Sequence, residues 1–238
     1  MAGGTDLKVK IFADGADVGE MVALAQNPLI AGFTTNPTLM RKAGVANYEA
    51  FAKDALAAIT THPISFEVFA DEFDEMQRQA LKIRDWGENL YVKIPITNTR
   101  SESAIPLIRR LAAEGVKVNV TAAMTIEQVR AVAAVMDGAP PAYISVFAGR
   151  IADTGRDPEP VMRDAVAAIK RLPQVELIWA SPREVYDIKR ADAVGCHIIT
   201  VTYDLLKKLP LFGKDLETFS LETVQMFFDD ARAAGYSL

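Results

Sequence analysis

The chain has 238 residues, of which 50% are hydrophobic and 24% are charged, and its formal net charge is −5 at pH 7. This acidic balance argues against a nucleic-acid-binding protein, because such domains are usually basic. A single cysteine excludes an internal disulfide, and two histidines with that cysteine make a poor set of metal ligands. No apolar stretch approaches the roughly 18 residues that span a bilayer, and no signal core marks the start. We therefore expect a cytoplasmic protein without a metal, another cofactor or a membrane partner.

Short runs rich in Val, Ile and Phe alternate with longer amphipathic segments along the whole chain. Most of these runs are continuously apolar, which is typical of parallel strands covered on both faces. The segments between them carry apolar residues at helical spacing, as at Ile105, Ile108 and Leu111. Eight strands are predicted, at residues 8–13, 29–33, 64–69, 90–95, 116–121, 142–147, 175–180 and 196–201.

Helix start and stop signals agree with this alternation. Asp71 and Thr125 stand where the N-caps of two predicted helices belong. Gly115 and Gly195 each follow a predicted helix and precede a strand, where a left-handed residue is favoured.

Eight units of about 30 residues match the size of βα units that close into a barrel. The competing arrangement is a doubly wound open sheet, but its glycine-rich turn is absent after the first strand, where residues 12–16 are FADGA. We therefore predict one α/β domain over residues 1–238, a single (βα)8 TIM barrel. The tail at about 211–238, with its amphipathic segment 221–234, is predicted to be an additional C-terminal helix.

Polar side chains end or directly follow seven of the eight predicted strands. In barrels of this kind, catalytic residues gather at the carboxyl ends of the strands, so the pattern predicts one active site in an enzyme. The candidates are Asp14, Thr34, Thr35, Asn36, Glu67, Lys93, Asn119, Thr121, Ser145, Arg150, Ser181 and Arg183.

Lys93 is the most informative candidate, because it lies in the apolar run LYVKIPI. Burial disfavours the charged form of an amine, and the neutral amine is the form that attacks a carbonyl to make a Schiff base. The alternative is a structural lysine that forms a buried ion pair with Glu67 or Asp14. In the catalytic interpretation, Asp14 and Glu67 are the groups available for proton transfer. Their structural alternatives are a helix N-cap for Asp14 and a surface position for Glu67.

Arg150, Ser181 and Arg183 are predicted to bind a phosphate, since guanidinium groups bind phosphate bidentately and barrel phosphate sites often follow the later strands. The alternative is that both arginines are solvated surface residues. Arg100 is either a further phosphate contact or part of the first turn of a helix.

Five short motifs, each at a strand end, carry a family resemblance. They are TTNPTL at 34–39, VKIP at 92–95, VNVT at 118–121, GRI at 149–151 and ASPR at 180–183. In order and spacing they resemble the transaldolase family, and the length resembles its small transaldolase and fructose 6-phosphate aldolase branch. The resemblance implies a metal-independent Schiff-base enzyme that acts on phosphorylated sugars. It also implies a homo-oligomer, a pentamer or decamer, and the tail residues Met226, Phe227 and Phe228 are a candidate docking face.

The resemblance assigns a role to each matching residue. For catalysis, it implies Lys93 as the Schiff-base lysine, Asp14 as the acid/base residue, and Glu67 with Thr121 as the pair holding a catalytic water. For substrate binding, it implies Asn36, Asn119 and Ser145 at the dihydroxyacetone unit and Arg150, Ser181 and Arg183 at the phosphate. Thr35 and Phe147, which lie in or beside these motifs, complete the expected substrate-binding set.

Departures from the family pattern concern the acceptor side of the expected pocket. Gly15 stands where Thr is usual, and Ala122, Ala123 and Met124 stand where bulky apolar residues are common. The aldolase branch tends to carry Gln at the position of Glu67 and Tyr at that of Phe147, so both residues favour transaldolase activity. The alternatives are an aldolase using free dihydroxyacetone, a non-catalytic sugar-phosphate-binding barrel and a barrel isomerase with a carboxylate base.

Overall fold

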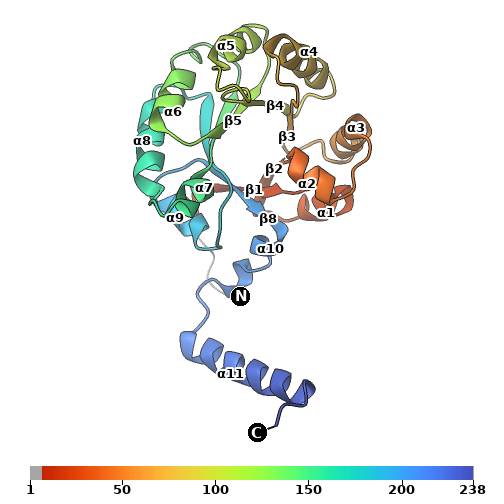
Figure 1. The fold of residues 1–238 in the computed structure, drawn as a ribbon, viewed down its shortest axis with the longest axis vertical. Coiled ribbons are helices and arrows are strands. Elements are labelled where there is room, and N and C mark those ends of the chain that lie inside the picture. The colour runs from red at the N-terminus through yellow and green to blue at the C-terminus, as the bar shows by residue number, and fades with distance from the viewer. Residues whose placement is uncertain (1–6, 238) are drawn as a thin grey trace. The chain divides into compact units, whose positions relative to one another are not determined.

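A computed structural model describes residues 7–237 of the chain. Its eight parallel strands form a closed barrel in which each strand pairs with the next and β8 pairs with β1. Figure 1 shows the strands as an inner ring inside a layer of helices. The predicted (βα)8 barrel is therefore confirmed. The strands are β1 Lys10–Asp14, β2 Ile30–Thr34, β3 Ile64–Glu67, β4 Leu90–Pro95, β5 Val118–Ala123, β6 Ala142–Val146, β7 Val175–Trp179 and β8 Ile198–Thr202.

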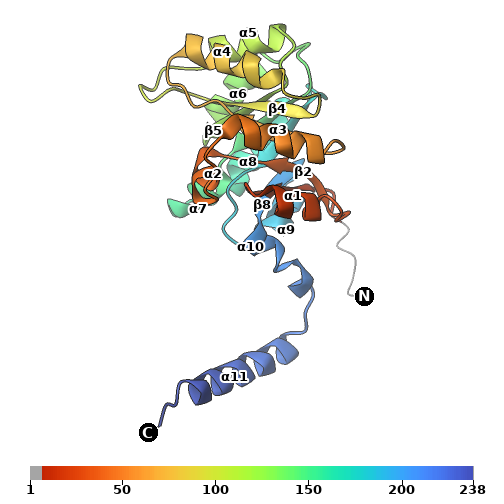
Figure 2. The same ribbon diagram turned by 90° about the vertical axis from the view of Figure 1, so that its right-hand side faces the viewer.

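The helices follow the strands in alternation, with two α-helices each after β2, β6 and β8. Helices α1 and α3 pack side by side in the outer layer, as both views show (Figures 1 and 2). The helices are α1 Val18–Leu24, α2 Pro37–Lys42, α3 Tyr48–Ala58, α4 Phe73–Arg84, α5 Ile105–Ala113, α6 Ile126–Ala133, α7 Ala148–Asp153, α8 Glu159–Ile169, α9 Asp187–Ala193, α10 Tyr203–Leu206 and α11 Leu216–Ala233.

Every strand except β4 ends at a different residue from the one expected, and the ends of the first three strands concern candidate site residues. Asp14 and Thr34 are the last residues of β1 and β2 and pair with each other across the sheet, instead of following the strands. Glu67 ends β3, which was expected to continue to residue 69. All three side chains therefore sit at the carboxyl end of the barrel.

The predicted caps have mixed outcomes. Thr125 is confirmed as the N-cap of α6, where it forms a capping box with Gln128. Gly115 and Gly195 are confirmed in the left-handed region, with φ of 78° and 76°. The prediction for Asp71 was wrong, because the N-cap position of α4 is the next residue. The Asp71 carboxylate instead accepts hydrogen bonds from the backbone N–H and the hydroxyl of Thr99, each at 2.7 Å.

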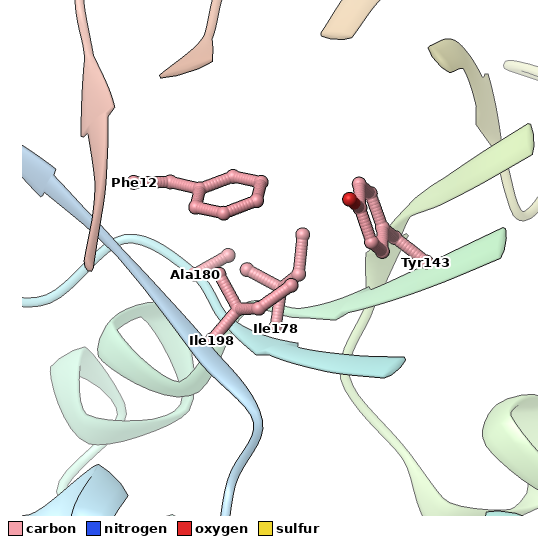
Figure 3. Packing of buried hydrophobic residues seen from close by; sticks show 5 residues of the cluster. All are labelled: Phe12, Tyr143, Ile178, Ala180 and Ile198. Atoms are coloured by element: carbon pink, nitrogen blue, oxygen red, sulfur yellow. The ribbon is translucent and has the colours of Figure 1, made fainter. Parts of the chain in front are cut away.

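Aromatic side chains fill the barrel one layer below the candidate site. Phe12, Tyr91 and Tyr143 each lie two residues before a polar candidate on the same strand, and residues two apart share one face. The Tyr143 ring stacks on Tyr91 with centroids 4.0 Å apart and meets Phe12 edge-on at 5.7 Å. Figure 3 shows Phe12 and Tyr143 pointing toward each other above Ile178 and Ile198. This packed layer gives the polar side chains above it an apolar floor.

The described residues form two compact units, 7–206 and 207–237. The second unit contains the 3₁₀ turn Leu209–Leu211 and helix α11, whose N-cap Asp215 accepts a hydrogen bond from the Thr218 N–H at 2.9 Å. Helix α11 begins before the predicted segment 221–234, and none of its side chains is buried. No helix within residues 7–237 has the length and apolar composition of a membrane span.

Candidate active site

Lys93 lies at the centre of a row of polar residues on three neighbouring strands. The register places Glu67 of β3 and Asn119 of β5 directly beside it on β4. The Lys93 side chain is buried, and its Nζ lies 3.0 Å from Glu67 Oε2. The same Nζ donates a hydrogen bond to the Thr35 carbonyl at 2.8 Å. The buried ion pair named as an alternative is therefore present, and it puts a proton acceptor next to the amine.

Asp14 belongs to the same buried group of charges. Burial raises the pKa of its carboxyl group, whereas the charge of Lys93 and a hydrogen bond from Thr34 lower it. The Thr34 hydroxyl donates to Asp14 Oδ1 at 2.9 Å. A buried carboxyl group with a raised pKa, close to a lysine, can exchange a proton with a reacting hydroxyl.

A chain of buried polar side chains lines the barrel beside Lys93. The Ser145 hydroxyl donates to Asn119 Oδ1 at 2.7 Å, and Asn119 Nδ2 donates to the Ser65 hydroxyl at 3.0 Å. All three residues are buried. Their mutual bonds fix the orientation of the Asn119 amide, since an amide inside a protein keeps the orientation that satisfies its partners.

Thr121, next along this face of β5, has a buried hydroxyl without a hydrogen-bond partner in the described part of the chain. The following residue, Ala122, has φ of 62° at a register shift between β5 and β6. A small residue is therefore compatible with the bulge at this position, where a β-branched side chain at positive φ is a strained outlier.

The predicted phosphate-binding residues gather after β6 and β7. The Arg183 guanidinium forms an ion pair with Asp153 and donates from Nη1 to the Ser181 hydroxyl at 3.2 Å. The hydrogen bonds that Arg183 donates to the Asp153 carboxylate lower the pKa of Asp153. The Arg150 guanidinium lies 5.7 Å from the centre of the Phe147 ring. Two cationic groups and a hydroxyl therefore come from helix α7, which contains Arg150, and from the loop after β7.

Three other candidates have structural partners. The Thr35 hydroxyl donates to the Ser65 carbonyl at 2.9 Å, and Asn36 Oδ1 accepts the Leu39 N–H as the N-cap of α2 at 3.0 Å. Arg100 lies in the loop before α5, among the carboxylates of Asp71, Glu72 and Glu102. The ion pairs of Arg100 give no support to the further phosphate contact considered for it.

The sequence model of the family described as transaldolase/fructose-6-phosphate aldolase matches residues 11–238. The chain belongs to this family. It is 35% identical over 222 residues to a probable transaldolase 2 of Listeria monocytogenes, covering 89% of this chain and 94% of that protein. It is 32% identical over 202 residues to a probable transaldolase of Dehalococcoides mccartyi, covering 84% and 90%.

Solved structures also resemble this transaldolase-family enzyme in fold. A putative lyase/mutase from Burkholderia cenocepacia aligns with a TM-score of 0.59 and 13% identity over 98% of this chain and 86% of its own. A dihydrodipicolinate synthase from Rhodopseudomonas palustris aligns with a TM-score of 0.58 and 13% identity over 94% and 79%. At this identity the likeness concerns the barrel fold alone.

Two residues of this transaldolase-family site were missing from the sequence prediction. Ser65 lies two residues before Glu67 in ISFEVF, so the alternation of strand faces could have identified it. Tyr48 of α3 donates its hydroxyl hydrogen to the Glu67 carbonyl and accepts the Glu67 N–H, both at 2.7 Å. No local pattern marks Tyr48, because it reaches the end of β3 from the helical layer.

Proposed function

We propose that this chain is a transaldolase that moves a dihydroxyacetone unit from a ketose phosphate to an aldose phosphate through a Schiff base on Lys93. Sedoheptulose 7-phosphate is the proposed donor and glyceraldehyde 3-phosphate the acceptor, as in the pentose phosphate pathway. The observation that carries this proposal is the buried Lys93 amine, 3.0 Å from the Glu67 carboxylate and beside Asn119. Family membership supports the same chemistry.

The proposed reaction begins when the neutral Lys93 amine adds to the ketone carbon of the donor. The carbonyl oxygen leaves as water after taking up protons, and a protonated imine remains. The Asp14 carboxylate then accepts the proton of the neighbouring hydroxyl while the carbon–carbon bond breaks. The electrons of that bond move into the protonated imine to give an enamine, and the shortened aldehyde leaves.

Transfer is completed by the reverse steps with a different aldehyde. The enamine carbon attacks the acceptor, and Asp14 returns its proton to the new hydroxyl group. Water then hydrolyses the imine and frees Lys93. We assign the orientation of this water to Glu67 and Thr121, because the Glu67 carboxylate adjoins Lys93 and the Thr121 hydroxyl is buried without a partner in residues 7–237.

Substrate binding is assigned to the flanking polar groups. Asn119 and Ser145, with Asn36, are proposed to bind the hydroxyls of the dihydroxyacetone unit. The phosphate is assigned to Arg150, Ser181 and Arg183, with Phe147 beside Arg150 and Thr35 beside Lys93.

Borohydride reduction tests the imine directly. We expect incubation with fructose 6-phosphate and borohydride to fix a dihydroxyacetone-derived mass on the peptide containing Lys93. Lys93→Ala should abolish the labelling, whereas Lys82→Ala, which changes an exposed lysine of α4, should retain it. Labelling that persists in Lys93→Ala contradicts the assignment.

Product analysis separates transfer from simple cleavage. With fructose 6-phosphate as the donor and erythrose 4-phosphate as the acceptor, a transaldolase forms sedoheptulose 7-phosphate, whereas an aldolase releases free dihydroxyacetone. Glu67 and Phe147 favour transfer through the resemblance described above. Dominant release of free dihydroxyacetone would show that the aldolase alternative is correct.

We also propose that the enzyme is a cytoplasmic homo-oligomer, a pentamer or decamer, whose copies associate through α11. This helix exposes many large apolar side chains, and covering such a surface is the usual source of association energy. They are Leu216, Phe219, Leu221, Val224, Met226, Phe227 and Phe228. Light scattering of the full chain should detect the oligomer, and Phe227→Asp should dissociate it; a monomeric parent protein contradicts the proposal.

A further inference from the structure

Gly15 and Tyr203 share one space at the carboxyl end of the barrel. A Cβ atom built on Gly15 lies 2.7 Å from both Cζ and Oη of Tyr203, closer than real Cβ contacts, which essentially never fall below 3.0 Å. Thr, the residue that the family resemblance implies at this position, would require the Tyr203 ring to shift. The Tyr203 ring therefore takes the place of a side chain at position 15.

The strand register explains how two residues so distant in sequence meet. Asp14 of β1 pairs with Thr202 of β8, so the residues that follow them, Gly15 and Tyr203, are neighbours as well. The Gly15 N–H donates to the Thr34 carbonyl at 3.1 Å and continues the strand ladder for one residue. Because side chains alternate along a strand, position 15 faces away from the side to which Asp14 points. The ring lies behind the backbone that carries the Asp14 carboxyl group.

We propose that Tyr203 is a positioning residue for Asp14, whose ring fixes the backbone at Gly15 and closes the site to water from the outer side. This inference rests on the proposed role of Asp14 as the acid/base group. β8 is also the strand at whose end the sequence predicted no polar candidate, so Tyr203 adds a contribution from the eighth strand. The buried Tyr203 hydroxyl has no hydrogen-bond partner within residues 7–237, which favours a packing role for the ring.

The charges around this pair determine the expected pH dependence. Burial is the largest cause of the raised pKa of Asp14, so admitting water behind it lowers that pKa. Since the carboxylate form accepts the substrate proton, the acid limb of the activity profile then moves to lower pH. The groups that act on the Asp14 carboxyl are Lys93 of β4, Glu67 of β3 and the Thr34 hydroxyl of β2. The charged groups that act on the Tyr203 hydroxyl are Asp17, Glu20 and Asp14 itself.

Four single variants and one double variant test the proposal through pH–rate profiles, melting temperatures and borohydride trapping on Lys93. Tyr203→Leu should lower kcat by about tenfold or more, the scale of effect of a misplaced catalytic group, and move the acid limb to lower pH. Tyr203→Phe keeps the ring and should retain the parent profile. Gly15→Ala should perturb the profile in the parent but much less in the Tyr203→Leu background. Gly87→Ala is the matched control, because a Cβ there meets Leu56 at an ordinary 3.4 Å.

The outcomes distinguish a failure of the positioning role of Tyr203 from a failure of the proposed function. If Tyr203→Leu retains the parent's acid limb and kcat and still forms the adduct on Lys93, that result overturns the positioning role and leaves the proposed function intact. A Tyr203→Phe profile as altered as that of Tyr203→Leu assigns the effect to the hydroxyl and also overturns the role of the ring. Additive effects of Gly15→Ala and Tyr203→Leu overturn the shared-space argument. A parent chain with neither adduct nor transfer overturns the proposed function, and the role of Tyr203 with it.

Discussion

The loop that follows β7 and contains Ser181 offers the most quantitative prediction, because Gly149 is in contact with its backbone. A Cβ on Gly149 would lie 1.5 Å from the Ser181 carbonyl oxygen, whereas real Cβ atoms essentially never approach within 3.0 Å. Gly149→Ala therefore requires the helix and the loop to separate by at least the difference of these distances, 1.5 Å. The loop has little freedom to relax, since Ser181 already has φ of 63°.

This displacement moves Ser181 and Arg183 away from the position at which we propose that they bind phosphate. A misplacement of about 1 Å can cost on the order of 100-fold in rate. We therefore expect kcat/KM for a phosphorylated donor to fall by about 100-fold, or about 2.7 kcal/mol of transition-state stabilisation. Trapping of unphosphorylated dihydroxyacetone on Lys93 should be much less affected, since the imine forms elsewhere in the barrel.

The matched control is Gly155→Ala, just after the same helix. Gly155 has φ of 76° and no atom within 4 Å of its built Cβ, so the substitution adds backbone strain without displacing the loop. We expect Gly155→Ala to lower the free energy of unfolding by about 1–2 kcal/mol, as measured by urea unfolding. The preference for phosphorylated over unphosphorylated substrates should change little. A Gly149→Ala variant that processes phosphorylated donors like the parent protein would contradict the expected displacement of the loop. An equal loss of activity toward phosphorylated and unphosphorylated substrates would contradict it as well.

Three further substitutions or treatments follow from buried polar groups. Because burial raises the pKa of Asp14, ionising it costs the folded protein free energy, and stability falls as pH rises from 3.8 through the higher folded pKa. Asp14→Asn should therefore abolish transfer yet unfold at higher urea than the parent at pH 7. Asn119→Ala leaves the hydroxyls of Ser65 and Ser145 without their shared partner and should cost about 1–3 kcal/mol in unfolding free energy. Burial raises the pKa of Cys196 to about 12, so a thiol reagent at pH 8 should modify it only after denaturation. Rapid modification of the native protein would contradict that burial.

The barrel was predictable because its signal is repeated along the chain. Each buried strand is a short apolar run, and β4 has the predicted bounds, residues 90–95. The ends of β1 and β2 were harder to predict, since the ladder continues into Asp14 and Thr34. Asp is unfavourable in a strand by local preference, whereas Thr is favourable, so for Asp14 the pairing with the neighbouring strand decides.

Asp71 shows why a good local signal can still fail. An aspartate before an amphipathic segment favours an N-cap. The fold, however, determines which hydrogen-bond donors reach the carboxylate. In the structure the backbone N–H and hydroxyl of Thr99 occupy the two carboxylate oxygens, each at 2.7 Å. Thr99 lies in a loop after the next strand, so no window of sequence around Asp71 contains the competing partner.

In the candidate site, too, the residue types were predictable from the sequence, whereas their contacts depend on the fold. Sequence position alone determines that Glu67, Lys93 and Asn119 are polar residues in apolar strands, and hence that they need partners inside the barrel. Which of them meet depends on the register, which pairs Glu67 with Lys93 and Lys93 with Asn119. Tyr48 then fixes the backbone of Glu67 from the helical layer, through a contact that depends on packing outside the barrel. The proposed reactivity of the Lys93 amine therefore depends on the closed sheet and its surrounding helices, and we expect Tyr48→Phe to alter it although Tyr48 lies outside the barrel.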